Sequence, residues 1–130
     1  MVMDEVDAIW KGYAFEALIF HELRAYNSLS QKARPIFHYA VSGGFDVDFL
    51  VQTKPKTLSS PRQLVAIEVK SSKKFRSDWI PPLKILLKEC GKSVQRAIVV
   101  YQGADRLKVD GVEVIPVETF LETLHAGEVF

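Results

Sequence analysis

The sequence has few of the features that would place a protein outside the cytoplasm. It holds a single cysteine, Cys90, among 130 residues. One cysteine excludes a disulfide framework and a metal site built from several cysteines, and it fits a reducing compartment. No stretch reaches the roughly 20 apolar residues that span a bilayer. The first residues include Asp4 and Glu5, whereas a signal peptide starts with basic residues. We therefore expect a cytoplasmic protein with no membrane contact.

The sequence also lacks a strong net charge and a phosphate-binding glycine loop. The formal net charge is +1, so any surface that binds nucleic acid must be local. Gly91, Lys92 and Ser93 resemble the end of an ATP-binding loop, but that motif needs a glycine at the position of Leu86. What the chain does have is 48% hydrophobic and 25% charged residues, the balance of a globular protein. We expect one domain over residues 1–130.

Hydrophobic periodicity predicts an α/β domain. The expected order is helix, three strands, helix, two strands and helix, at residues 4–26, 36–41, 45–51, 64–70, 81–90, 97–101, 112–115 and 117–125. Residues 42–44 form a turn, and the polar loop 52–63 should join antiparallel strands. The continuous apolar run 97–101 is typical of a strand inside a parallel sheet.

The apolar stripe of the first helix is assigned by helical spacing. Its members are Val6, Ile9, Trp10, Tyr13, Ala17, Phe20 and Leu23, widened by Leu18 and Ile19. Because the helix is apolar on more than one side, we expect it to contact a partner subunit or a further domain as well. We assign Trp10 and Trp79 to the core or to an interface.

An acid and a lysine close the third strand. Alternation along a strand places Glu68 and Lys70 on one face and Val65, Ile67 and Val69 on the other. A carboxylate at the end of a core strand is costly to desolvate, so a neighbouring group must compensate it.

The preceding strand carries acids in the same way. Alternation places Phe45, Val47, Phe49 and Val51 on one face and Asp46 and Asp48 on the other. If the polar faces of the two strands adjoin, they form a small anionic site with one lysine. The alternative is a solvated strand end beside a solvated face.

Such a site suits a divalent cation and a phosphate. Hard cations take oxygen ligands, which Asp48 and Glu68 would supply from adjacent strands. The metal would polarise a phosphoryl oxygen and help to generate hydroxide, while Lys70 would orient that nucleophile or stabilise developing charge. Glu16 lies on a largely apolar flank of the first helix, from which it could reach the metal or its water.

A basic segment follows the third strand. Lys73, Lys74 and Arg76 would hold phosphates of a nucleic acid beside the site. A solvated turn is the alternative.

Three motifs together resemble the PD-(D/E)XK nuclease superfamily: Gly-Tyr-Ala-Phe-Glu ending at Glu16, Phe-Asp-Val-Asp-Phe around Asp48, and Ile-Glu-Val-Lys-Ser around Glu68 and Lys70. Their order along the chain is also that of the superfamily. Val47 stands where the superfamily's name has proline. The chain is similar, more narrowly, to the nuclease-like domain at the C-terminus of prokaryotic AAA-type ATPases. That resemblance rests on the segments 22–25, 44–49, 67–70, 115–116 and 120–121.

The resemblance implies a restriction-endonuclease-like fold, a central mixed β-sheet of about five strands flanked by helices in the order α-β-β-β-α-β-β-α. It implies a Mg²⁺- or Mn²⁺-dependent endonuclease that hydrolyses DNA phosphodiester bonds, with Asp48, Glu68 and Lys70 as catalytic residues and Glu16 as an accessory metal ligand. A homodimer or an ATPase is the expected protein partner. The competing hypothesis is a non-catalytic module on the nuclease fold that binds DNA or protein as an ATPase accessory domain.

Overall fold

The computed structural model describes the backbone of residues 2–41 and 43–130 and the side chains of residues 7–40 and 43–130. Val6 and Ser42, which the sequence placed in the helix stripe and in the turn, lie outside the described side chains. The helices are α1 (Val2–Leu29), α2 (Ile80–Cys90) and α3 (Val117–His125), with short 3-10 helices at Ser77–Trp79 and Gly91–Ser93. The strands are β1 (Ile36–Val41), β2 (Phe45–Lys54), β3 (Gln63–Lys70), β4 (Val94–Tyr101), β5 (Leu107–Val109) and β6 (Val112–Pro116).

The strands form one mixed sheet in the order β1-β2-β3-β4-β6-β5. The predicted α/β class is confirmed. β2 and β3 are antiparallel on either side of the polar loop, and β4 lies between two parallel neighbours, as the sequence indicated. The sequence predicted about five strands, whereas the sheet has six, because periodicity did not reveal β5. β5 has three residues with Lys108 at its centre, too short and too polar to show a period.

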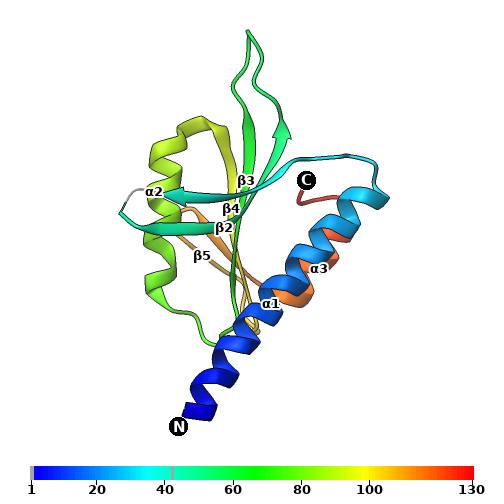
Figure 1. The fold of residues 1–130 in the computed structure, drawn as a ribbon. Coiled ribbons are helices and arrows are strands. Elements are labelled where there is room, and N and C mark those ends of the chain that lie inside the picture. The colour runs from blue at the N-terminus through cyan, green and yellow to red at the C-terminus, as the bar shows by residue number, and fades with distance from the viewer. Residues whose placement is uncertain (1, 42) are drawn as a thin grey trace.

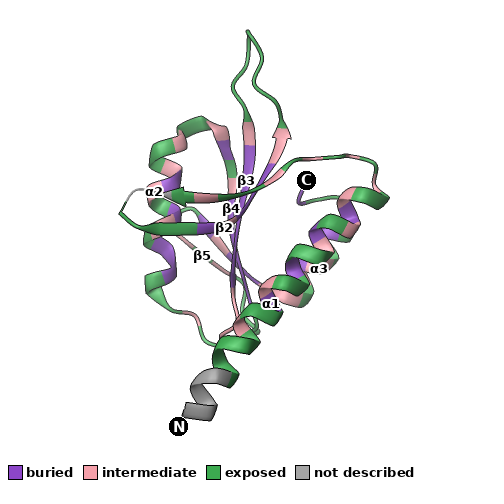
Figure 2. Cartoon of the chain, viewed as in Figure 1, coloured by how far each residue is buried: buried purple, intermediate pink, exposed green. Residues whose placement is uncertain are grey.

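Helices cover both faces of the sheet (Figure 1). Val65, Ile67 and Val69 of β3 pack in one cluster with residues of α1 and α3. Leu64 and Ala66 pack in the other cluster with residues of α2. The predicted alternation of β3 is therefore confirmed. Figure 2 shows the buried residues along the strands and on the helix faces that meet them.

The predicted core stripe of α1 is confirmed at Leu23 and Ile19 and wrong in its N-terminal half, where Ile9, Trp10 and Tyr13 are 57%, 68% and 66% exposed. Among the described side chains of α1, Phe15 and Tyr26 are also buried. The helix is apolar on two sides, so its own periodicity does not decide which side meets the sheet. The first turns of α1 also extend past the end of the sheet (Figure 1). Trp79 is buried, as expected.

The predicted alternation of β2 is confirmed for Phe49 and Val51, which pack in the same cluster, but it is wrong for Val47, because the strand contains a bulge. Tyr39 pairs with Val47 but Phe37 pairs with Leu50, so two steps along β1 oppose three along β2. The extra residue reverses the faces. Val47 therefore packs on the α2 side of the sheet, while Phe49 packs on the α1 side.

Candidate active site at the split between β2 and β3

The site lies where β2 and β3 separate. Their last registered pair at this end of the ladder is Phe49 with Ile67. Beyond that pair, the Val69 N–H donates to the Asp48 carboxylate at 2.8 Å. A side chain has thus replaced a main-chain acceptor, and this hydrogen bond fixes Asp48 against the end of β3. The bulge that reverses β2 lies beside Asp48.

Glu68 is the buried charged residue of the described part of the chain, with 6% of its surface exposed. The pKa of Glu68 is raised to about 9, above all by burial. A hydrogen bond with Asp48 and the negative charges of Asp48 and Glu16 contribute to this rise, and Lys70 opposes it. At neutral pH, Glu68 therefore holds a proton next to Asp48.

Glu16 reaches the same site from α1. Burial raises the pKa of Glu16, and the negative charge of Asp48 raises it further, while His38 and Lys70 oppose the shift. Gly12 brings the helix close to the strand end, since a Cβ at this position would lie 3.7 Å from Ser71 Oγ. α1 thus passes beside the residue that follows Lys70. The structure therefore brings the carboxyl groups of Glu16, Asp48 and Glu68 and the amine of Lys70 within electrostatic range of one another.

A hollow of about 250 Å³ opens beside Glu16. Tyr13, Phe20 and Phe49 line it with the acid. The rings of Phe20 and Phe49 are stacked, with their centroids 5.4 Å apart. The acid therefore faces a small space with aromatic walls.

His38 is a neighbour of the site that the sequence did not single out. Its Nδ1 lies 3.3 Å from the main-chain oxygen of Asp48, and its Nε2 lies 3.8 Å from the Asp46 carboxylate. His38 also lowers the pKa of Glu16 electrostatically. A signal was present in the sequence, because a hairpin that turns at residues 42–44 brings His38 opposite Asp48.

The basic segment lies on the other side of Lys70. Lys70 and Arg76 line a hollow of about 330 Å³ with Ser71 and Ser72. Arg76 forms two hydrogen bonds of 3.2 Å to Asp78, so this guanidinium is already paired. Lys73 and Lys74 are exposed. Of the three residues predicted to contact phosphates, the two lysines are therefore more available to a phosphate than Arg76.

The carboxyl groups do not form a complete metal cage. Among the residues that the structure describes, no three His, Cys, Asp or Glu side chains are arranged to hold a metal ion. The chemistry of the donors nevertheless fits a hard divalent cation, which prefers carboxylate oxygens and keeps several waters. A dication in place of the Glu68 proton would neutralise the repulsion from Asp48 and Glu16, which adds to the effect of burial on this pKa. Asp48 and Glu68 would hold such an ion, with Glu16 reaching its water.

The fold and the site define a mixed α/β domain with a buried acid and a lysine at the split of its sheet. The chain belongs to the family described as "Domain of unknown function (DUF4143)", whose model matches residues 11–120. The matched span includes Glu16, Asp48, Glu68 and Lys70. No curated protein matches the chain. Within the described residues, no helix combines the length and the apolarity needed to cross a membrane.

Proposed function

We propose that this domain is a PD-(D/E)XK-type, Mg²⁺- or Mn²⁺-dependent endonuclease with a restriction-endonuclease-like fold that hydrolyses DNA phosphodiester bonds. The observation that carries the proposal is the buried Glu68. Burial, a hydrogen bond with Asp48 and the charges of Asp48 and Glu16 raise its pKa to about 9, and Lys70 opposes the rise. A buried acid with a strongly raised pKa beside a specific charged partner is a common property of catalytic sites. The cytoplasmic location is part of the proposal and rests on the single cysteine.

Each residue has a distinct role in the proposed reaction. Asp48 and Glu68 would hold the cation, which would supply Lewis acidity to the scissile phosphate. Glu16 accepts a hydrogen bond from water at the helix side of the site. Lys70 orients the attacking water and stabilises the negative charge that develops on the phosphate.

The DNA backbone is proposed to approach over the segment after β3. Lys73, Lys74 and Arg76 contact phosphates there, close to Lys70. Such contacts position the strand without reading its sequence, and they weaken as salt concentration rises. Arg76 must exchange Asp78 for a phosphate, so the two lysines provide most of the initial attraction.

The test is nicking of supercoiled plasmid in Mg²⁺ or Mn²⁺. We expect activity in the wild type and a loss of roughly 100-fold or more in Glu68→Ala and in Lys70→Ala. Asp46→Asn is the matched control, because Asp46 lies on the same hairpin but its side chain is exposed and it is not among the groups that shift the pKa of Glu68. Equal cleavage by the wild type and both site variants would identify a contaminant and would reject the proposal.

One observation favours the second candidate, a non-catalytic module that binds DNA or protein as an accessory to an ATPase or within a homodimer. The described residues contain no ready-made group of three metal ligands. In this case the plasmid would stay intact, while the protein would retard labelled DNA, or co-purify with an ATPase, equally well in the wild type and in Glu68→Ala.

A further inference from the structure

The strand β1 leaves one edge of the sheet open. Its outer side pairs with no strand in the described ranges 2–41 and 43–130. An open edge presents main-chain donors and acceptors to other chains, and proteins usually protect it with charge or by keeping the strand short. The opposite edge, β5, has both protections, since it is three residues long with Lys108 at its centre. β1 lacks both protections. It is six residues long, and its sequence Ile-Phe-His-Tyr-Ala-Val contains no Asp, Glu, Lys or Arg.

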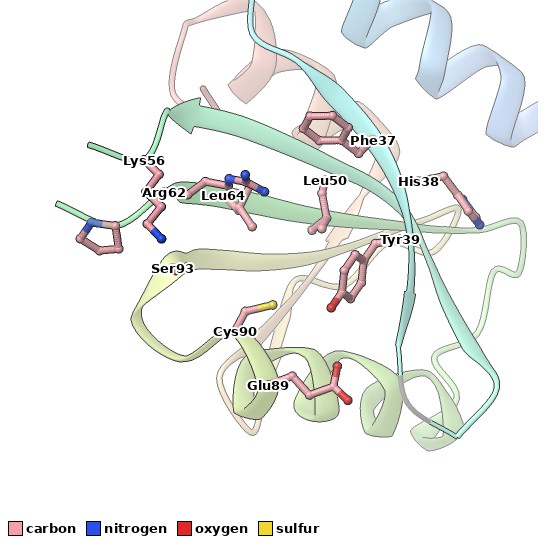
Figure 3. Close-up of a pocket in the computed structure, with 11 residues that line it drawn as sticks. Phe37, His38, Tyr39, Leu50, Lys56, Arg62, Leu64, Glu89, Cys90 and Ser93 are labelled. Carbon is pink, nitrogen blue, oxygen red and sulfur yellow. The ribbon is translucent and has the colours of Figure 1, made fainter. Parts of the chain in front are cut away.

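A hollow of about 680 Å³ runs beside this open edge. We call it the β1 groove; it is lined by Phe37, His38, Tyr39, Leu50, Lys56, Pro61, Arg62, Leu64, Glu89, Cys90 and Ser93. Figure 3 shows that it is surrounded by side chains of β1, of β2, β3 and the connection between them, and of the end of α2. Phe37 is 44% exposed although it is a large apolar side chain. The groove therefore offers an apolar surface next to a row of main-chain hydrogen-bonding groups.

The charges of the β1 groove are distributed unevenly. Lys56 and Arg62 come from the connection between β2 and β3, whereas Glu89 comes from α2 (Figure 3). Within the described part of the chain, neither Lys56 nor Arg62 forms a hydrogen bond or an ion pair. A ligand that fills the groove would thus have an anionic group beside Lys56 and Arg62 and an apolar part in the centre of the groove.

We propose that the β1 groove binds an extended, acidic peptide segment of a partner protein, which adds to the sheet as a strand along β1. Its main chain pairs with the open edge. Its apolar side chains cover Tyr39, Leu50 and Leu64, and a carboxylate contacts Lys56 and Arg62. A peptide fits better than a nucleic acid, because only a peptide main chain matches the donors and acceptors of a strand edge.

The proposal does not depend on nuclease activity. None of Glu16, Asp48, Glu68 and Lys70 lines the groove. A protein without nuclease activity would still bind the peptide, and an active nuclease need not bind it. The two proposals can therefore fail separately.

The test uses a labelled pool of octapeptides with glutamate at alternate positions and random Val, Ile, Leu or Phe between them. Amide chemical shifts of the isotope-labelled protein are recorded during titration, and affinity is measured by fluorescence anisotropy. We expect the shift changes to concentrate on Ile36–Val41. The double substitution Lys56→Glu and Arg62→Glu should weaken binding by about tenfold or more. Lys108→Glu, a charge reversal on the opposite edge, should leave binding unchanged.

Three controls separate strand addition from other modes. The same peptides with N-methylated amides should bind at least about tenfold more weakly, because they lack N–H donors. Equal binding of methylated peptides, or no binding of any peptide, overturns the proposal. Tighter binding of an eight-nucleotide single strand that depends on Lys56 and Arg62 would assign the groove to phosphates instead. A dimer in sedimentation with no peptide bound, together with concentration-dependent shift changes on Ile36–Val41, would assign the edge to a second copy of the chain.

Discussion

At the scale of single residues, the site depends on Glu68, which lies buried and protonated beside Asp48 at the end of β3. The pKa of about 9 arises from burial and from Asp48, 20 positions earlier in the chain, so it needs the tertiary structure. His38 could have been found by counting the hairpin register. The pairing of the Val69 N–H with Asp48 could not, because it depends on how β2 and β3 separate.

The raised pKa of Glu68 predicts a pH-dependent stability in the absence of divalent cations. Between pH 4.5, its ordinary pKa, and about 9, Glu68 is protonated in the folded protein and ionised in the unfolded chain. Unfolding therefore releases a proton, and the free energy of unfolding falls as pH rises through this window. Urea unfolding in EDTA from pH 5.5 to 8.5 measures this slope.

Glu68→Gln supplies the comparison for that slope. Glutamine imitates the protonated acid, so the variant should keep its stability at pH 8.5 better than the wild type. Glu118→Gln, at an exposed position of α3, should follow the wild type. Parallel curves for the wild type and Glu68→Gln would contradict the assigned protonation.

The hydrogen bond between Asp48 and Val69 predicts a difference between two substitutions at Asp48. Asp48→Ala and Asp48→Asn remove the same charge, but asparagine keeps an oxygen that accepts from the Val69 N–H. We expect Asp48→Ala to be less stable than Asp48→Asn by about 1–3 kcal/mol, the cost of an unpaired buried donor. Chemical denaturation at a fixed pH measures the difference, and equal stabilities would show that the hydrogen bond contributes nothing.

At the scale of elements, strands and helices were predicted better than the faces they bury. The predicted helix and strand positions agree with α3 and β1, and the parallel setting of β4 followed from its continuous apolar run. The errors concern faces. α1 is apolar on two sides and β2 contains a bulge, and in both cases contact with other elements decides which residues are buried. Periodicity within one element does not contain that information.

The corrected face of α1 predicts a contrast between two isoleucines. Ile19 is fully buried and Ile9 is 57% exposed. Ile19→Ala should lower the free energy of unfolding by about 2–5 kcal/mol, the range for a large-to-small change in a core. Ile9→Ala should change it by less than about 0.5 kcal/mol. Thermal or urea unfolding measures both, and a larger loss in Ile9→Ala would contradict the exposed position of this side chain.

At the scale of the whole molecule, the order of the strands and the packing of α1 bring motifs that are far apart in the sequence to one site. Glu16, Asp48 and Glu68 lie on three elements, and they approach one another because α1 packs over β3 while β2 pairs with β3. The order of elements made this arrangement predictable. The same topology leaves β1 at an open edge, which no motif in the sequence indicated, because strand order is a property of the assembled sheet.

Calorimetric titration of the metal-free protein with Mn²⁺ at pH 7.5 decides whether these acids form one cation site. We expect saturable binding that releases a proton, that is lost in Glu68→Gln and that is kept in Asp46→Asn. No uptake of Mn²⁺ by the folded wild type, or equal uptake by Glu68→Gln, would contradict this expectation.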